Sequence, residues 1–277
     1  MTMNRGLVVF SDLDGTLLDH ASYSFAPAEP ALRLLRDKRI PLVLCSSKTR
    51  PEIEAVRSSL GNDEPFIAEN GGAVFLPAGR FSLESLPARR LPGYEVVEFG
   101  TPYARLVEAW ELISRQFPGK LRGFHELSAG QVAGLTGLSV EDAELALRRE
   151  YDEPFVLSDP SLGEAIRETV RRSGLTVVRG GRFFHLTGDN DKGRCARFLS
   201  LLYALFLGRP VTSIGLGDSA NDLPLLEAVD YPVLVRKPGG EYDPAVRLPG
   251  IYLAPGEGPE GWNATILDLV PRLAGES

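Results

Sequence analysis

Two apolar segments near opposite ends of this 277-residue chain each stop at a cluster of carboxylates and glycines. Residues 7–10 lead to Asp12 and Asp14, and residues 211–216 lead to Asp218. Short apolar runs bounded by glycine and polar residues are typical of buried strands. Because parallel strands bring their carboxyl ends to one edge of a sheet, we expect the two clusters to converge there.

The pattern between these segments extends the same architecture. Further strands are expected near residues 40–45, 65–69 and 231–236, separated by amphipathic helices such as residues 51–60. Strands that alternate with helices are typical of a doubly wound parallel sheet. The expected fold class is therefore α/β, with a Rossmann-like core.

The middle of the chain does not follow this alternation. Between about residue 84 and residue 187 the pattern changes to a mixture of strands, one long helix and shorter helices. We therefore expect an inserted α+β cap at residues 84–187, and a catalytic core made of residues 1–83 and 188–277. A cap of this kind closes over a site and supplies contacts to the substrate.

Asp12 and Asp14 are the first candidates for catalysis. Alternate side chains of an extended segment point the same way, so both carboxylates can face one crevice. Gly15 permits a sharp turn after them. A simple Asx-turn would account for Asp14 and Gly15 but would leave Asp12 unexplained.

Clustered carboxylates repel one another, and a hard divalent cation removes that repulsion. Mg²⁺ prefers oxygen ligands from a few carboxylates, water and substrate phosphate. The sequence therefore predicts a Mg²⁺ site, with ligands drawn from Asp12, Asp14, Asp218, Asn221 and Asp222.

Ser46 and Lys192 complete the expected core site. Ser46 follows the strand at residues 40–45, and Lys192 opens a helix. A hydroxyl and an ammonium group both suit the oxygens of a transferring phosphoryl group. Taken alone, the serine fits a helix N-cap and the lysine fits a solvated first turn. In one chain with both aspartate clusters, they favour catalysis.

In this order the chain resembles the haloacid dehalogenase superfamily of phosphohydrolases, whose four motifs match residues 12–16, Ser46, Lys192 and residues 217–222. Within it, the chain is similar to the mannosyl-3-phosphoglycerate phosphatases at residues 45–50, 136–151 and 181–188. The wider sugar-phosphatase group usually has Thr-Gly-Arg where this chain has Ser46-Ser47-Lys48. The resemblance implies Mg²⁺-dependent release of phosphate from mannosyl-3-phosphoglycerate, a step in compatible-solute synthesis.

The resemblance, together with the charges of these groups, implies different roles for the two aspartates. Asp12 is expected to attack phosphorus and form an aspartyl phosphate, while Asp14 donates a proton and later accepts one. Thr16 is expected to steady Asp14 or the turn. The expected substrate contacts are Thr16, Ser46, Ser47, Lys48 and Lys192 in the core, and Arg149, Arg182 and His185 in the cap.

Each of these cap residues also fits a purely structural interpretation. Arg149 also fits a solvated helix face, and His185 also fits an ordinary strand position between Phe184 and Leu186. A substrate with a glycerate carboxylate needs a group to bind it, and a guanidinium fork is well suited. Arg182 is the expected carboxylate ligand because it precedes the strand that returns to the core, and Arg149 or another cap arginine is the alternative.

The net charge and the apolar pattern of the chain limit which partners and locations are expected. A net charge of −7 disfavours binding to nucleic acid or to an anionic membrane surface. The chain lacks an apolar run long enough to span a membrane and lacks a leader pattern, so a cytoplasmic location is expected. The expected partner is a small phosphorylated sugar-glycerate. The sequence leaves the oligomeric state open.

Other functions fit the same motifs. A phosphatase of sucrose phosphate or of a hexose phosphate, a phosphomutase, and a non-catalytic phosphosugar sensor remain alternatives. The intact pair of Asp12 and Asp14 disfavours the sensor, whereas no sequence feature by itself excludes the mutase.

Overall fold

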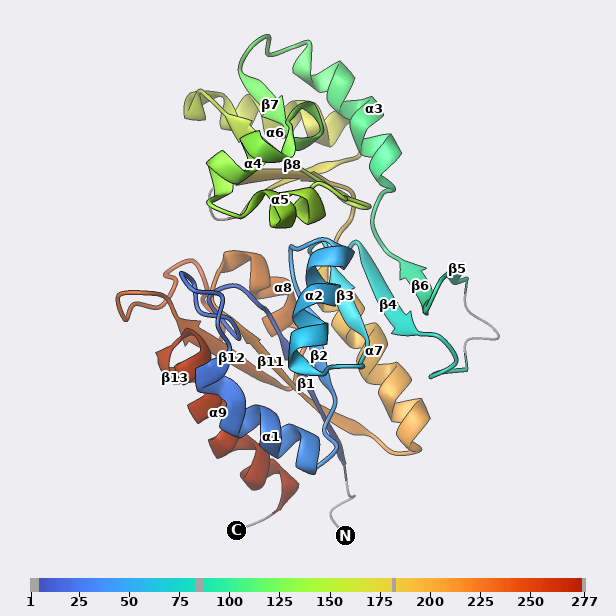
Figure 1. The fold of residues 1–277 in the computed structure, drawn as a ribbon, viewed down its shortest axis with the longest axis vertical. Helices are drawn as coiled ribbons and strands as arrows, with labels where there is room; N and C mark the ends of the chain where they lie inside the picture. The colour runs from blue at the N-terminus through green and yellow to red at the C-terminus, as the bar shows by residue number, and fades with distance from the viewer. Residues whose placement is uncertain (1–4, 83–86, 181–182, 276–277) are drawn as a thin grey trace.

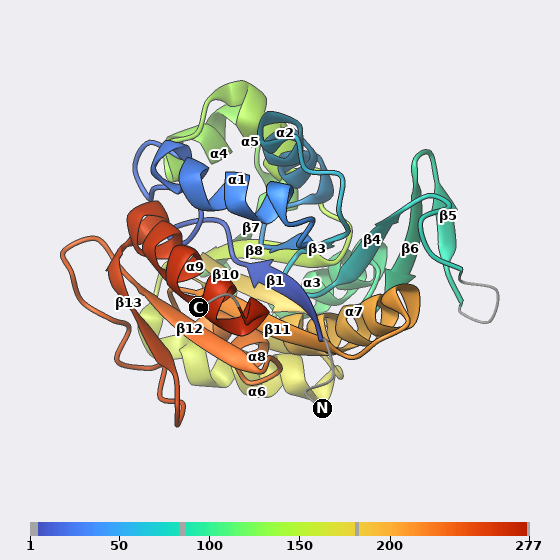
Figure 2. The ribbon, with the colours of Figure 1, turned by 90° about the horizontal axis from the view of Figure 1, so that it is seen from below.

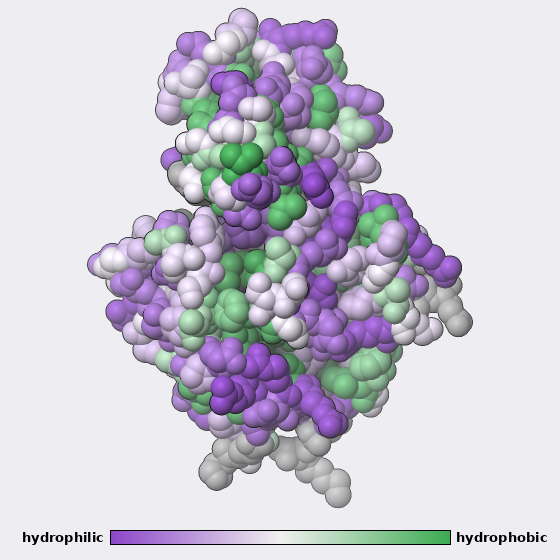
Figure 3. Space-filling model, viewed as in Figure 1, coloured by the Kyte–Doolittle hydropathy of each residue, from purple (hydrophilic) through white to green (hydrophobic). Residues whose placement is uncertain are grey.

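The computed structural model describes residues 5–82, 87–180 and 183–275. Figure 1 shows a larger core, which contains both ends of the chain, and a smaller cap above it. The molecule narrows between these two parts, and polar side chains gather along this waist (Figure 3). No helix within the described residues is long and apolar enough to cross a bilayer.

The core is built on a sheet of nine strands, counted within the described residues, in the order β13-β12-β11-β1-β2-β3-β4-β6-β5. The strands from β13 to β3 run parallel, and those from β3 to β5 run antiparallel. They are β1 (Gly6–Ser11), β2 (Leu42–Cys45), β3 (Phe66–Ala68), β4 (Ala73–Pro77), β5 (Arg89–Leu91), β6 (Tyr94–Glu98), β11 (Val211–Gly217), β12 (Tyr231–Arg236) and β13 (Tyr252–Glu257).

Successive side chains of the strands point to opposite faces of the sheet, and both faces are apolar. Helices therefore cover both of them. Val9 packs with one cluster, on the side of α1 (Glu29–Asp37), α2 (Arg50–Leu60) and α9 (Gly258–Ala274). Val8 packs with the other, on the side of α7 (Lys192–Leu207) and α8 (Leu223–Leu226). Figure 2 shows α1 and α9 on one side of β1 and α8 on the other. The expected doubly wound α/β core is confirmed.

The cap has its own antiparallel sheet of four strands within the described residues, in the order β7-β8-β10-β9. Its elements are α3 (Tyr103–Ser114), β7 (Leu121–Gly123), α4 (Ala129–Thr136), α5 (Val140–Ala146), β8 (Asp152–Leu157), α6 (Gly163–Arg172), β9 (Thr176–Gly180) and β10 (Phe183–Thr187). Helices α3 and α6 cover one face, where Trp110 and Ile166 pack against Phe155. The expected α+β cap is therefore present.

Short 3-10 turns connect several of these elements: η1 (Ala26–Ala28), η2 (Phe124–Glu126), η3 (Pro160–Leu162) and η4 (Ala220–Asp222).

The border between core and cap differs from the sequence-based expectation. Strands β5 and β6 extend the main sheet, although residues 84–187 are expected to form the cap. Strand β6 pairs with β4, and its Val96 is fully buried in the core. Sheet membership therefore favours a cap that begins after Glu98.

Candidate active site

The end of β1 places two aspartates in different surroundings. The Asp12 amide donates to Leu216 O on β11 at 2.9 Å, which joins the two strand ends, and its side chain is buried. Asp14 lies farther out, with 33% of its side chain exposed. Gly15 has a φ of 76°, and a Cβ atom there would lie 3.0 Å from Asp218 Oδ2. The glycine thus permits the turn and the approach of Asp218.

Lys192 joins two of the carboxylates. Its ammonium donates to Asp12 Oδ1 at 2.7 Å and to Asp222 Oδ1 at 2.6 Å. Only 1% of the lysine is exposed, and burial of this kind is tolerated when a charge is well paired. The second oxygen of Asp12 is not part of this contact, and it remains available for chemistry.

The local sequence explains why Lys192 reaches this position. Asp191 caps α7 by accepting from the amides of Gly193 and Arg194, so the lysine enters in the first turn. A Cβ atom at Gly193 would lie 2.1 Å from Pro224 O, so only glycine allows α7 to pack this closely on α8.

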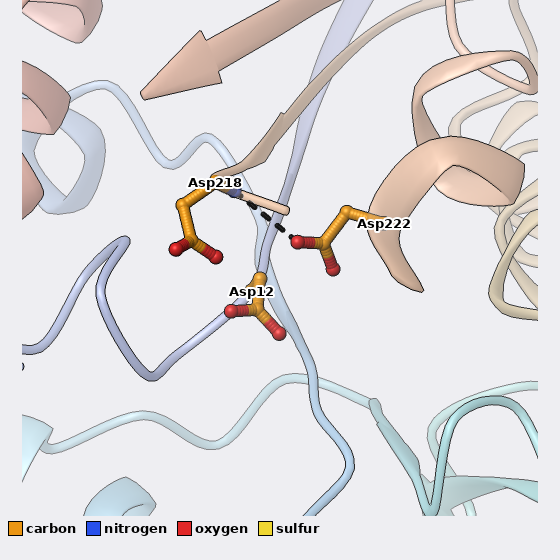
Figure 4. A group of neighbouring side chains, drawn as sticks. All are labelled: Asp12, Asp218 and Asp222. Carbon is orange, nitrogen blue, oxygen red and sulfur yellow. Dashed lines mark hydrogen bonds between the residues drawn. The ribbon is translucent and has the colours of Figure 1, made fainter. Parts of the chain in front are cut away.

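Asp12, Asp218 and Asp222 form one group, in which the nearest carboxylate oxygens all lie within 4.8 Å of one another (Figure 4). Burial raises the pKa of Asp12, and Asp222 raises it further, whereas Lys192 lowers it. Burial and then Asp222 raise the pKa of Asp218 to about 6. The group therefore holds more negative charge than one lysine neutralises.

This donor set fits a hard divalent cation, which takes carboxylate oxygens. Asp222 is partly engaged already, because its Oδ2 accepts from the amides of Asp218 and Ser219 at 3.2 Å each. Asp12 and Asp218 have the freer oxygens. The structure thus brings together residues that would hold a metal ion.

Two of the five expected metal ligands lie differently. Asp14 Oδ2 is 3.0 Å from the ammonium of Lys48, so its carboxylate is drawn away from the group of three. Asn221 accepts from Ser219 Oγ within the turn that follows β11. Thr16 is buried, and its hydroxyl has no partner among the described residues.

The loop at residues 46–49 is held by its backbone. Three successive carbonyls accept hydrogen bonds: Ser46 O from Asn70 N at 2.9 Å, Ser47 O from Arg149 Nη1 at 2.9 Å, and Lys48 O from Glu69 N at 3.1 Å. Ser46 is buried, and its Oγ accepts from Lys48 N at 3.2 Å. The Ser46 hydroxyl proton is consequently free to point elsewhere.

Glu69 and Asn70 were not among the residues expected from the sequence. Both adopt a left-handed backbone, with φ values of 50° and 58°. This turn directs their amides at the 46–49 loop. The Glu69 carboxylate also accepts from the cap amides of Glu150 at 2.9 Å and Tyr151 at 2.7 Å. The sequence signal for this turn was a charged residue directly after an apolar strand, followed by Asn70 and two glycines.

The cap residues expected at the site are placed as follows. Arg149 reaches the core, where it donates to Ser47 O, and also donates to Ala146 O at 2.8 Å. His185 is largely buried, with Nδ1 2.7 Å from Asp152 Oδ2. Arg182 lies outside the described residues.

Two other proteins are similar to this chain in sequence over nearly its full length. A glucosyl-3-phosphoglycerate/mannosyl-3-phosphoglycerate phosphatase from Methanococcoides burtonii is 47% identical over 266 residues, which cover 96% of this chain and 97% of the relative. A protein of the same name from Persephonella marina is 39% identical over 270 residues, with 96% and 98% covered. The family model of haloacid dehalogenase-like hydrolases matches residues 9–85. The chain belongs to the haloacid dehalogenase-like hydrolases.

The fold of this hydrolase occurs in solved structures as well. A phosphatase of the haloalkanoate enzyme superfamily from Bacteroides thetaiotaomicron superimposes with a TM-score of 0.67 at 18% identity, covering 99% of this hydrolase and 97% of that chain. Identity this low supports the fold alone. The resemblance to the superfamily expected from residues 12–16 and 217–222 is confirmed.

Proposed function

We propose that this hydrolase releases phosphate from glucosyl-3-phosphoglycerate and mannosyl-3-phosphoglycerate. One observation carries the proposal: a buried aspartate paired with Lys192, beside two further carboxylates, in a chain that is 47% identical over nearly its full length to a phosphatase named for these substrates. The sequence alone favoured the mannosyl substrate. Both similar proteins are named for both sugars, so the proposal includes both.

In the first step, an oxygen of Asp12 attacks phosphorus, and the bond between phosphorus and the glycerate oxygen breaks. Lys192 holds Asp12 Oδ1, so Oδ2 is the oxygen positioned to attack. The leaving oxygen takes a proton from Asp14. Phosphorus is then bonded to Asp12 as an acyl phosphate.

In the second step, water attacks phosphorus, and the bond to Asp12 breaks. Asp14 accepts a proton from the water, which returns it to the state that began the cycle. Lys48 lies 3.0 Å from Asp14 Oδ2 and stabilises its ionised form after proton donation.

We propose Mg²⁺ as the cation held by Asp12 and Asp218, with Asp222 engaged by Lys192 beside them. When bound, the ion supplies positive charge to the phosphoryl oxygens. The excess of carboxylates over Lys192 supports this assignment, as do the raised pKa values of Asp12 and Asp218.

Two neighbouring groups are proposed to bind the phosphoryl oxygens. Ser46 Oγ already accepts from the Lys48 amide, so its own proton can be donated to the substrate. Lys192 supplies a positive charge in addition to that of the proposed Mg²⁺. Thr16 is proposed to support the turn, since it is fully buried two residues after Asp14.

The cap residues differ in how many of their side-chain donors and acceptors are already engaged. Arg149 has donors committed to Ser47 O and Ala146 O, so we propose that it supports the 46–49 loop. His185 has only Nδ1 engaged, which leaves Nε2 for the substrate. Arg182 remains the proposed ligand of the glycerate carboxylate.

A phosphate-release assay with Mg²⁺ tests the function. The substrates are glucosyl- and mannosyl-3-phosphoglycerate, with sucrose phosphate and glucose 6-phosphate as comparators. We expect kcat/KM for a glycosyl-3-phosphoglycerate to exceed that for the comparators by at least tenfold. A preference for sucrose phosphate or a hexose phosphate would overturn the substrate assignment. Phosphate transfer without net release would indicate a mutase, and binding without turnover a sensor.

A further inference from the structure

Strand β8 carries two neighbouring carboxylates, Asp152 and Glu153, that are both fully buried. Each lies 2.7 Å from the Nδ1 atom of a histidine, His185 for Asp152 and His125 for Glu153. Successive residues of a strand point to opposite faces of the sheet. The two pairs therefore have the same chemistry in two different places.

Glu153 lies on the face that α3 and α6 cover, and its hydrogen bonds are complete. Its Oε1 accepts from the amide and Nδ1 of His125, and its Oε2 accepts from the Tyr103 hydroxyl at 2.5 Å. Both oxygens are thus satisfied inside the cap. A buried polar group with all its partners present holds structure together and needs no ligand.

Asp152 lies on the opposite face, and its hydrogen bonds are incomplete. The register of β8 with β10 puts His185 opposite Pro154, on the same face as Asp152. Asp152 Oδ1 is buried and has no partner in the part of the chain that the structure describes. His185 Nε2 likewise has no hydrogen-bond partner among those residues.

Contacts link this face of the cap to the core loop that carries Ser46. Arg149 Nη1 lies 3.7 Å from Asp152 Oδ2 and 2.9 Å from Ser47 O in the 46–49 loop. The series of contacts from His185 through Asp152 and Arg149 therefore ends one residue from Ser46. This link is the reason to assign a ligand of His185 Nε2 to the same substrate as the phosphoryl site.

The available atoms indicate what this group must be. With Nδ1 engaged by Asp152, Nε2 is the ring atom of His185 left for a ligand. Arg149 already has two donors engaged, by Ala146 O and Ser47 O, and it holds the 46–49 loop. A hydroxyl group both donates and accepts hydrogen bonds, so it suits Nε2 as either partner, whereas a carboxylate only accepts. On the proposed substrate, that group is a hydroxyl of the sugar.

We propose that Asp152 is a positioning residue for sugar recognition, which holds the His185 ring so that Nε2 forms a hydrogen bond with a sugar hydroxyl. This inference rests on the proposed function. It divides the substrate between two parts of the molecule. The core motifs bind the phosphate, and the Asp152–His185 pair binds the glycosyl group.

The test compares substrates that differ by the sugar. Purified Asp152→Asn is assayed with mannosyl-3-phosphoglycerate, with 3-phosphoglycerate, which lacks the sugar, and with p-nitrophenyl phosphate. We expect kcat/KM for the glycosyl substrate to fall at least tenfold more than for the other two, with most of the change in KM. His185→Phe should shift the same ratio, and the double variant should shift it no further, since the two residues act as one unit.

The matched control is Glu153→Gln, which disrupts the neighbouring pair on the covered face. It should lower the melting temperature and change all substrates by one common factor. If Asp152→Asn behaves like this control, or leaves every substrate unaffected, the inference is wrong. A loss shared by 3-phosphoglycerate would assign the pair to the glycerate instead. If Asp152→Asn does not fold, the ratio measured for His185→Phe decides.

Failure of the proposed function gives a different result. In that case the parent enzyme hydrolyses p-nitrophenyl phosphate but shows no preference for glycosyl-3-phosphoglycerates. The inference fails on its own when the parent shows this preference and neither Asp152→Asn nor His185→Phe reduces it.

Discussion

The core and the cap both bury carboxylates, but they balance the charge differently. In the core, Asp12, Asp218 and Asp222 surround one lysine, and the pKa values of Asp12 and Asp218 are raised. In the cap, each carboxylate at the start of β8 has its own histidine. The core group is completed only by an added positive charge, whereas the cap pairs are nearly complete within the protein.

This difference separates chemistry from recognition. An excess of buried negative charge is costly for stability, and the cation proposed above would offset it. Carboxylates that each have a histidine partner orient that side chain through hydrogen bonds within the protein. Changes in the core should therefore affect every substrate, and changes in the Asp152 pair should affect mainly the glycosyl part.

The largest effect is expected for Asp12→Asn. The amide keeps the size of the carboxylate but cannot attack phosphorus, so kcat should fall by about 10³-fold or more on all substrates. Phosphate release and circular dichroism are measured together. The control is Asp63→Asn, at an exposed position in the core. A residual kcat within tenfold of the parent would contradict the covalent mechanism.

Removal of the metal should have the next largest effect. EDTA should abolish phosphate release, and added Mg²⁺ should restore it. Asp218→Ala should raise the Mg²⁺ concentration needed for half activity by about 10- to 100-fold, because a freer oxygen ligand is lost. Calorimetric titration of Mg²⁺ into each protein gives a readout independent of turnover. Full activity after chelation, or unchanged Mg²⁺ affinity in the variant, would show that the three carboxylates do not form the site.

Arg149 tests the border between the two regions, since it belongs to the cap but holds the 46–49 loop. Arg149→Lys cannot keep both carbonyl contacts, which a guanidinium fork provides and an ammonium does not. We expect kcat to fall by about tenfold, equally for glycosyl-3-phosphoglycerate and p-nitrophenyl phosphate, which corresponds to about 1.4 kcal/mol. The exposed neighbour Arg148→Lys is the control. A selective loss of the glycosyl substrate would instead make Arg149 a sugar ligand.

The convergence of the strand ends could be predicted because it depends on a local pattern. Apolar runs that stop at Asp12 and Asp218 predict parallel strands, and the topology of such sheets brings their ends together. The pairing of Asp14 with Lys48 could not be predicted, since it depends on where two loops lie in space. Sequence spacing shows which residues share an edge and does not show which of them touch.

The cap was less predictable for the same reason. Strand β5 (Arg89–Leu91) has no apolar alternation, so its membership of the main sheet depends on pairing with β6. Asp152 and Glu153 are adjacent, and only the strand geometry shows that they face opposite ways. Glu69 is another case, because its partners lie 81 and 82 residues away.

The last expected effect is on stability and not on turnover, and it concerns Glu69, where the core contacts the cap. Burial raises the pKa of Glu69 from its ordinary 4.5 to about 8, although Arg149 and the two cap amides oppose the shift. Between these values the folded protein binds more protons than the unfolded chain. The free energy of unfolding should therefore fall as pH rises from about 5 to about 8, with at most about 1.4 kcal/mol per pH unit from this group.

Glu69→Gln removes this titration and keeps the shape of the side chain. The amide can still accept from one of the two cap amides, so a loss of about 1 kcal/mol is expected at pH 5. The difference from the parent should shrink or reverse by pH 8, because only the parent loses stability over that range. Urea denaturation at pH 5, 6.5 and 8 measures this, with the exposed Glu144→Gln as control. Parallel curves for parent and Glu69→Gln would mean that Glu69 does not titrate in this range and that the cap amides keep it ionised throughout.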